Sequence, residues 1–212
     1  MTDLTNLRRV RLWRGDGLAF LLGFLRRPGL VGSVVPSSRF LERRIVNVAA
    51  IAKARLVVEF GPGTGGTTRA ILDALPEDAK LLAIEIDPEF ASHLRANRDP
   101  RLIVHLGSAE HIWETLAHYG LSRPDAIVSG LPFSTMPHAL GRRILYALWS
   151  CMAPGGRFVA YQFREQVALI GRELLGKPDI ELELLNVPPV RVYCWRKPAD
   201  EEMTGPPTLS AA

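Results

Sequence analysis

The residues best suited by type and spacing to do chemistry are a glycine-rich stretch and an acidic side chain that follows it. In Val57–Gly66 an apolar run leads into Gly61-Pro62-Gly63-Thr64-Gly65. Glycines are needed where the backbone turns sharply and approaches a ligand without a Cβ in the way. Glu85 ends the next apolar run, where its carboxylate can accept hydrogen bonds from both hydroxyls of a ribose. The spacing predicts a nucleoside-containing cofactor; an ordinary turn with a surface carboxylate is the alternative.

These residues need elements that position them, and from Arg55 onwards short apolar runs alternate with helical segments. Such alternation implies a parallel sheet covered on both faces. The last two runs are joined only by Asn186-Val187-Pro188-Pro189, and so short a connection requires an antiparallel pair. The predicted strands are 56–60, 81–86, 102–106, 126–129, 157–162, 180–185 and 190–195, and the predicted helices are 67–74, 89–96, 110–118 and 138–152.

We therefore predict an α/β fold, a doubly wound, seven-stranded and mostly parallel sheet, preceded by N-terminal amphipathic helices. Leu18, Leu21, Leu22 and Leu25 have the spacing of one helix face. A further helix should start after Pro36-Ser37-Ser38, where a serine can cap it, and run to about residue 52. The predicted organisation is a basic amphipathic segment over residues 1–35, a cofactor-binding domain over 36–197 and a disordered tail over 198–212.

The composition is typical of one globular domain, with 212 residues of which 47% are hydrophobic and 23% charged. The net charge of +4 is unevenly distributed, because residues 1–44 carry nine Arg against three acidic residues. Such asymmetry indicates an anionic partner, either a membrane surface or a nucleic acid. The apolar run 18–25 is too short to cross a bilayer, which takes ~20 residues. Cys151 and Cys194 lack metal-ligand spacing and are typical of free thiols, so we expect a cytoplasmic protein without a metal.

The glycine turn, together with Glu85-Ile86-Asp87-Pro88, resembles class I methyltransferases, which have a Rossmann-like fold, use S-adenosylmethionine and release S-adenosylhomocysteine. The resemblance implies that Glu59 lies near the methionine amino group and that Gly107-Ser108-Ala109 faces the adenine. Many relatives have Asp where this chain has Ser108. NAD is the rival cofactor, and Pro62 and the antiparallel ending argue against it. The implied cofactor-binding residues are Glu59, Gly61, Pro62, Gly63, Thr64, Gly65, Glu85, Ile86, Ser108, Ala109, Ser129 and Gly130.

Ser129-Gly130-Leu131-Pro132-Phe133, after the fourth predicted strand, resembles the substrate corner of two related families. In rRNA adenine dimethylases the pattern is N-L-P-Y, where Asn binds the target amine and the aromatic ring stacks on the base. Glycine stands at the Asn position in this chain and offers no acceptor. Bacterial phospholipid N-methyltransferases of the phosphatidylethanolamine type show S-G-L-P here, and residues 33–38 and 186–192 also resemble them. An aminophospholipid is therefore the expected substrate.

Several residues near this corner are candidates for handling such a substrate. Tyr161, at the end of the fifth predicted strand, could hold the headgroup through its hydroxyl or pack in the core. His138 could act as a base or simply start a helix. Arg164 and Arg191 could bind the lipid phosphate or be ordinary surface charges. We predict Tyr161 and His138 as catalytic residues, and Ser38, Leu131, Pro132, Phe133, Arg164 and Arg191 as substrate-binding residues.

The N-terminal segment independently suits attachment to a membrane. A short helix with Leu and Phe on one side and Arg around it would lie in the headgroup plane, and each Arg near an anionic leaflet contributes about 1 kcal/mol. Packing of this helix on the domain and an RNA-binding arm are the alternatives. We predict peripheral association with the cytoplasmic face of an anionic membrane, and no nucleic-acid partner, through Trp13, Leu18, Phe20, Leu21, Leu22, Phe24, Leu25, Arg26 and Arg27.

The function that these patterns favour is transfer of methyl groups to the headgroup amine of phosphatidylethanolamine, its mono- or dimethyl forms, or a similar aminolipid. A sulfonium methyl is already activated, so the protein mainly aligns the reacting atoms. Methylation of an rRNA adenine or of a soluble amine are the alternative reactions. A non-catalytic protein that binds the cofactor or a partner is a third possibility.

Overall fold

The computed structural model describes residues 37–199 of the chain. The predicted membrane segment, with the proposed contacts from Trp13 to Arg27, lies outside the described residues. Of the predicted tail over 198–212, residues 200–212 also lie outside them, whereas the Pro198 carbonyl accepts from the Gly155 amide at 3.1 Å. The description below therefore concerns the predicted cofactor-binding domain.

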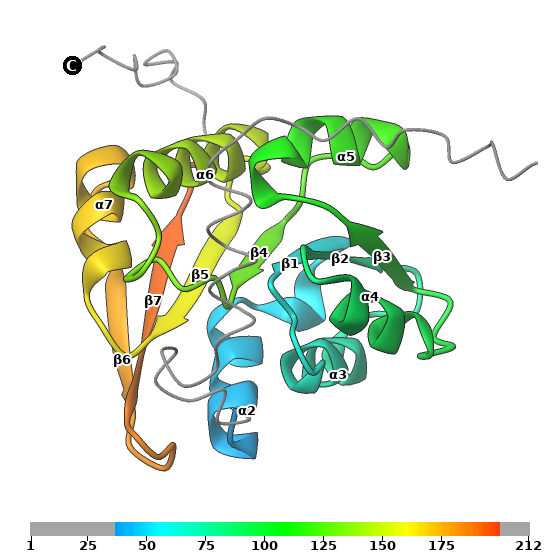
Figure 1. Ribbon diagram of the computed structural model, residues 1–212, viewed down its shortest axis with the longest axis horizontal. Coiled ribbons are helices and arrows are strands. Elements are labelled where there is room, and N and C mark those ends of the chain that lie inside the picture. The colour runs from blue at the N-terminus through cyan, green and yellow to red at the C-terminus, as the bar shows by residue number, and fades with distance from the viewer. Residues whose placement is uncertain (1–36, 200–212) are drawn as a thin grey trace, which may run out of the picture.

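Seven strands form one sheet in the order β3-β2-β1-β4-β5-β7-β6 (Figure 1). The strands β1 to β5 are parallel, and β7 is antiparallel to both of its neighbours, β5 and β6. The predicted sheet and its antiparallel ending are confirmed. The strands are β1 (Leu56–Phe60), β2 (Lys80–Glu85), β3 (Leu102–Leu106), β4 (Ala126–Ser129), β5 (Arg157–Gln162), β6 (Asp179–Glu183) and β7 (Val190–Arg196).

Helices cover both faces of this sheet, as Figure 1 shows. One face carries α2 (Arg39–Val48), α3 (Gly66–Ala74) and α4 (Pro88–Arg95). The other carries α5 (Ile112–His118), α6 (His138–Cys151) and α7 (Gln166–Leu175). Two short 3-10 turns, η1 (Ile51–Lys53) and η2 (Ala109–His111), precede β1 and α5.

The strands supply two cores because successive side chains of a strand point to opposite faces. Val57 and Val159 pack toward α2 and α3, whereas Val58 and Phe158 pack toward α5, α6 and α7. Every residue of β1 is buried. The central strands are therefore held rigidly, and the loops at their carboxyl ends start from fixed positions.

The structure departs from the predicted helices in two places. The helix α2 ends at Val48, because Ala50 adopts a left-handed conformation with φ of 53°, and η1 replaces the predicted last turn. The helix α7 was not predicted. Its interior contains Gly171, where an added Cβ would lie 2.3 Å from the Trp195 ring. A helix is hard to predict from sequence when a glycine interrupts its apolar spacing to make room for a tryptophan from a distant strand.

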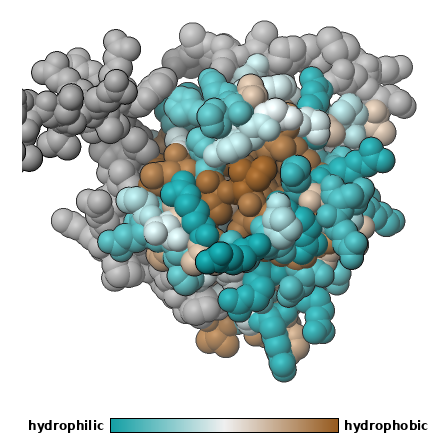
Figure 2. Space-filling view, turned by 90° about the vertical axis from the view of Figure 1, so that its right-hand side faces the viewer, coloured by the Kyte–Doolittle hydropathy of each residue, from teal (hydrophilic) through white to brown (hydrophobic). Residues whose placement is uncertain are grey.

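The surface of the described residues is mixed in character. The face drawn in Figure 2 is largely hydrophilic around a hollow with a hydrophobic floor. None of the helices between residues 37 and 199 is long and apolar enough to cross a membrane. Large exposed hydrophobic side chains occur together on β6 and on the turn that follows it, namely Ile180, Leu182, Leu184, Leu185 and Val187.

Candidate active site

The turn between β1 and α3 has a backbone that glycine adopts far more readily than other residues. Gly61, Gly63 and Gly65 have φ values of 66°, 55° and 83°. The Gly61 amide donates to the Ile84 carbonyl at 3.0 Å, which ties the turn to β2. A Cβ added to Gly63 would meet no atom within 4 Å. The backbone at Gly63 therefore borders open space that a ligand can approach closely.

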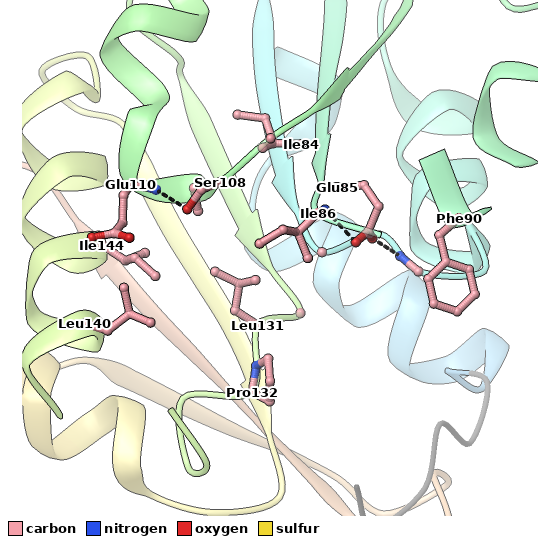
Figure 3. A pocket seen from close by; sticks show the side chains of 15 residues that line it. Ile84, Glu85, Ile86, Phe90, Ser108, Glu110, Leu131, Pro132, Leu140 and Ile144 are labelled. Atoms are coloured by element: carbon pink, nitrogen blue, oxygen red, sulfur yellow. Dashed lines mark hydrogen bonds between the residues drawn. The ribbon is translucent and has the colours of Figure 1, made fainter. Parts of the chain in front are cut away.

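Glu85, at the end of β2, holds this turn in place. Its Oε2 accepts from the Gly63 amide at 3.0 Å, and its Oε1 accepts from the Ile86 amide at 2.7 Å (Figure 3). The same Oε1 also accepts from the Asp87 amide at 3.0 Å. A carboxylate offers about four acceptor positions, so about one remains for a ligand hydroxyl. Backbone amides occupy both oxygens in this conformation, so the predicted bidentate bond to a ribose stays a prediction that requires at least one of these amides to be released.

A pocket opens beside this turn at the carboxyl ends of β1, β2 and β4. In Figure 3, Ile86 and Phe90 lie on one side of it, and Leu140 and Ile144 of α6 lie on the other. Flat apolar walls of this kind suit a purine ring. The predicted residues that line the pocket are Gly61, Gly63, Glu85, Ile86, Ser108, Ala109, Gly130, Leu131 and Pro132, together with Gly107 of the predicted adenine corner.

Five further lining residues were not predicted, namely Ile84, Phe90, Glu110, Leu140 and Ile144. Glu110 is the informative one, because it brings a carboxylate to the corner where Ser108 replaces the Asp of many relatives. Its Oε1 accepts from Arg143 Nε at 2.8 Å. An acidic residue two positions after Ser108 was a usable signal. No sequence signal marked the apolar lining residues of α4 and α6, since their position depends on how those helices pack.

Glu59 lies beneath the turn and is only 1% exposed. Its Oε2 accepts from Thr68 Oγ1 at 2.6 Å, while Oε1 has no hydrogen-bond partner among residues 37–199. Burial raises the pKa of Glu59 to about 8, and nearby Glu85 adds to the effect while the Thr68 bond opposes it. An unpaired buried oxygen costs free energy that a donor would recover. The amino group of S-adenosylmethionine is such a donor, so these residues fit that cofactor.

Tyr161, on β5, brings its hydroxyl to the backbone of Gly130 at the end of β4. A Cβ added to Gly130 would lie 2.6 Å from Tyr161 Oη and 3.0 Å from the Gly61 carbonyl oxygen. The same hydroxyl lies 3.4 Å from Thr67 Oγ1. Burial, then the charge of Glu59, raise the pKa of Tyr161 far above its usual range. The hydroxyl therefore stays protonated, and it can donate or accept one hydrogen bond at this corner.

Comparison with known proteins finds one matching family model and several similar methyltransferases. The model of the ribosomal RNA adenine dimethylase family matches residues 37–119. Ribosomal RNA small subunit methyltransferase A of Rhodococcus erythropolis is 34% identical over 96 residues, which are 43% of this chain and 31% of that protein. The ornithine lipid N-methyltransferase of Singulisphaera acidiphila is 35% identical over 187 residues, which are 85% of this chain and 96% of that protein. The chain belongs to this family of S-adenosylmethionine-dependent N-methyltransferases.

The fold of the methyltransferase agrees with solved structures. The O-methyltransferase TomG of Streptomyces achromogenes, solved in complex with SAM, superimposes with a TM-score of 0.61 at 17% identity. The match covers 89% of this chain and 92% of TomG. The chain therefore has the Rossmann-like methyltransferase fold, and S-adenosylmethionine is the cofactor.

Five predicted cofactor contacts of the methyltransferase do not line the pocket, and buried Glu59, described above, is one of them. Pro62 is buried inside the turn and Thr64 points to solvent. A Cβ on Gly65 would lie 3.0 Å from Leu94, so this glycine serves packing against α4. Ser129 is fully buried, and its hydroxyl accepts from the Leu131 amide at 3.3 Å. These residues shape the turns around the pocket.

Three predicted substrate or catalytic residues do not line the pocket, and burial contradicts the prediction for Phe133, whereas the roles of Ser38 and His138 stay predictions. Phe133 is 0% exposed and belongs to the core beside Met136, so it cannot touch a substrate. Ser38 caps α2, because its Oγ accepts from the Leu41 amide at 3.2 Å. His138 is an exposed first residue of α6 and does not line the pocket. His138 therefore starts a helix, which is the alternative prediction for this residue.

The two predicted phosphate ligands lie at the rim of the site. Arg164 is exposed just after β5. Arg191 Nη1 donates to the Phe163 carbonyl at 3.4 Å, and Nη2 lies 3.6 Å from Glu165 Oε1. Cys151 and Cys194 are free and buried. Among residues 37–199, no group of three or more His, Cys, Asp or Glu could hold a metal ion.

Proposed function

We propose that this methyltransferase methylates the headgroup amine of a membrane aminolipid. The observation that carries the proposal is the similarity to an ornithine lipid N-methyltransferase across 85% of the chain. The adenine dimethylase model, in contrast, matches residues 37–119 and stops before Gly130. The lipid enzyme is matched over 96% of its length, whereas ribosomal RNA small subunit methyltransferase A of Cutibacterium acnes, 30% identical over 163 residues, is matched over 51% of its length.

The geometry of the substrate corner supports an aliphatic amine more than an adenine. Gly130 offers no side-chain acceptor, and the nearby polar group is the Tyr161 hydroxyl. Phe133, the residue that would stack on a base, is enclosed in the core. A single-stranded base is usually held by stacking on an aromatic ring. Positions 130 and 133 therefore lack the acceptor and the accessible ring that the N-L-P-Y pattern of rRNA adenine dimethylases places there.

The residues at this corner can prepare an amine for reaction. S-adenosylmethionine, when bound, supplies a methyl group already activated for transfer. An amine with a pKa of about 10 must lose its proton to attack, which costs roughly 4 kcal/mol at pH 7. The apolar side chains of Leu131 and Pro132 disfavour the ammonium form by excluding water. The Tyr161 hydroxyl can accept an N–H bond of the amine and so orient its lone pair.

Phosphatidylethanolamine, its mono- and dimethyl forms and ornithine lipid all present an aliphatic amine on a flexible headgroup, and we include each among the proposed substrates. Such a substrate stays in the bilayer. We therefore also propose that the enzyme docks reversibly on the cytoplasmic face of an anionic membrane. The excess of Arg in residues 1–44 supports this docking.

The test is transfer of a labelled methyl group to matched acceptors. Purified enzyme would be given vesicles containing phosphatidylethanolamine or ornithine lipid, ribosomal RNA, and free ethanolamine or ornithine. Label should enter a lipid extract. Label in RNA alone, or in the free amines alone, would overturn the proposal. The Gly61→Ala variant should be inactive toward every acceptor, because Ala is strained at φ 66° and its Cβ would lie 3.2 Å from Leu131.

The lipid and the number of methyl groups can be identified in cells. The enzyme would be expressed in a bacterium that lacks methylated lipids, and the lipids analysed by mass spectrometry. Mono-, di- or trimethylated headgroups should appear with the wild-type enzyme and be absent with Gly61→Ala. An unchanged lipid profile from a well-expressed, folded enzyme would contradict the proposal.

A further inference from the structure

The hairpin between β6 and β7 carries large apolar side chains that no described residue covers. Leu184, Leu185 and Val187 are 66%, 62% and 79% exposed. Pro188 and Pro189, which follow them, are exposed as well. A soluble protein rarely groups so many exposed apolar side chains at one point without a binding role.

Hydrogen bonds hold this turn in a fixed conformation, and its apolar side chains therefore point outward. Asn186 is 3% exposed; its Oδ1 accepts from the Ser38 amide at 3.0 Å and its Nδ2 donates to the Pro188 carbonyl at 2.9 Å. Glu183 Oε1 accepts from the Leu185 amide at 2.9 Å, and Glu183 Oε2 accepts from Arg44 Nε at 2.7 Å. The buried polar groups face the domain and the leucines and valine face away.

The tip lies at the same edge of the sheet as the active site. Gln162, the last residue of β5, pairs with Arg191 near the start of β7, and Tyr161 pairs with Val192. Residues 184–189 therefore extend beyond the carboxyl end of β5, as Figure 1 shows for the turn between β6 and β7. The Tyr161 hydroxyl and the Leu131 carbonyl, which Gln162 contacts, lie at that same end. A surface that touches the tip also faces the substrate corner.

The charges near the tip suit an anionic surface. Arg164 is exposed at this edge, and Arg191 lies there with Glu165 beside it. The chain enters the described structure at the hairpin, through the bond between Ser38 and Asn186. Residues 1–36, which precede that point, hold six Arg and two Asp. Apolar side chains flanked by Arg are the combination that binds the interface of anionic bilayers.

We propose that residues 184–189 form a membrane contact that is separate from residues 1–36. In this contact, Leu184, Leu185 and Val187 insert into the boundary between headgroups and acyl chains. The inference rests on the proposed function, because a bilayer substrate is what requires this edge to meet a membrane. Contact at the tip would bring a headgroup amine to the edge where Gly130 and Tyr161 lie.

The first experiment measures binding of the full chain to vesicles of equimolar phosphatidylcholine and phosphatidylglycerol by sedimentation. Leu184→Ser/Val187→Ser should weaken partitioning on the order of tenfold or more, and Val187→Ser alone by a smaller factor. Ile180→Ser is the matched control, since Ile180 is 46% exposed on β6 but lies at the opposite end of that strand. The loss should persist at high salt, because it is apolar, whereas binding by Arg is screened.

A second measurement detects insertion directly. Val187→Cys would carry an environment-sensitive dye, with a dye on Ile180→Cys as the control; labelling is selective because Cys151 and Cys194 are buried. Vesicles should shift the emission of the dye at 187 to the blue and leave the dye at 180 unchanged. A dye at 187 that vesicles do not shift overturns the proposal. A dye at 187 that is already shielded without vesicles also overturns the proposal. Shielding at every protein concentration would indicate that residues 1–36 cover the hairpin, and shielding only at high concentration would indicate a second copy of the chain.

Activity on a short-chain aminolipid dispersed without a bilayer separates this inference from the proposed function. The serine variants should methylate it at the wild-type rate while methylating the same headgroup in vesicles more slowly. Equal loss on both forms would contradict a docking role for the hairpin. If no lipid is methylated by any form of the enzyme, the proposed function fails, and the dye measurement still decides whether the hairpin inserts.

Discussion

The hydroxyl of Tyr161 occupies the space in which a side chain at position 130 would stand. A Cβ on Gly130 would lie 2.6 Å from that oxygen and 3.2 Å from the ring carbon that carries it. Real contacts are not that short, so an added side chain must displace the hydroxyl. Glycine at 130 and tyrosine at 161 therefore act as a pair.

Gly130→Ala should lower kcat/KM for the lipid substrate about ten- to a hundredfold, because the displaced Tyr161 hydroxyl no longer orients the amine and a lost hydrogen bond costs about 1–3 kcal/mol. The measurement is steady-state kinetics with calorimetric binding of S-adenosylhomocysteine. We expect the product of the cofactor to bind within a few-fold of wild type, since the displaced group lies on the substrate side.

The control is the double variant Gly130→Ala/Tyr161→Phe, which removes the oxygen in the closest contact. It should be more active than the product of the two single effects predicts, so the double-mutant cycle should give a coupling energy that differs from zero. Strictly additive effects would show that Gly130 is required only for its contact with the Gly61 carbonyl.

Stability should depend on pH through Glu59. The pKa of this carboxyl is about 8 in the folded protein against 4.5 for a free side chain. Between these values the native state holds a proton that the unfolded chain has released, so the free energy of unfolding falls as pH rises and levels off above about 8. The slope for one proton is ~1.4 kcal/mol per pH unit. Glu59→Gln should flatten this slope and be more stable than wild type at pH 9.

Urea denaturation of both proteins across the pH range measures this effect. Glu114→Gln, which changes an exposed carboxylate on α5, is the matched control and should keep the wild-type slope. A Glu59→Gln variant with the wild-type pH slope would show that Glu59 is ionised in the folded protein.

Glu85→Gln should impair both the glycine turn and cofactor binding. A carboxamide offers one accepting oxygen in place of two, so at least one of the amides of Gly63, Ile86 and Asp87 loses its partner. The loss of a buried bond to a charged acceptor costs about 1–3 kcal/mol. Calorimetry should show tenfold or weaker binding of S-adenosylhomocysteine. Glu89→Gln on α4 is the control, and wild-type affinity in Glu85→Gln would contradict the role of the carboxylate.

Arg44 should protect the fold against acid. It binds Glu183 at 2.7 Å and Glu181 at 2.6 Å, linking α2 to β6, and its bond lowers the pKa of Glu183. A lowered pKa contributes stability above the ordinary carboxyl pKa, and that stability is lost as pH falls through the lowered value. Arg44→Gln should cost about 1 kcal/mol near neutral pH and move the acid-unfolding midpoint upward. Arg43→Gln, exposed on the same helix, should leave that midpoint unchanged.

Local patterns in the sequence sufficed for much of the fold. The alternation of apolar runs and helical segments predicted the five parallel strands, and the short link from Glu183 to Val190 predicted the antiparallel ending. The glycines at 61, 63 and 65 predicted a turn with unusual backbone angles. Each of these features depends on neighbouring residues, so a reading along the chain can find it.

Other features could not be predicted in this way. The helix α7 contains Gly171 because a larger side chain there would clash with the Trp195 ring. The pocket walls at Phe90 and Ile144 come from helices that are far apart in sequence. Phe133 has the residue type of a substrate contact but faces the core. The direction of a side chain at the end of a strand is decided by how the neighbouring helices pack.

By itself, the sequence determined where the strands and most of the helices lie along the chain, the glycine turn, the acidic residue that follows it and the family of the enzyme. Only the tertiary structure decided that Glu85 binds the turn, that Glu59 keeps one unpaired oxygen, that Tyr161 meets Gly130 and that the tip of the last hairpin is uncovered. The physical reason is that spacing along the chain encodes local conformation. Burial, hydrogen-bond partners and exposure instead arise where segments distant in sequence come into contact.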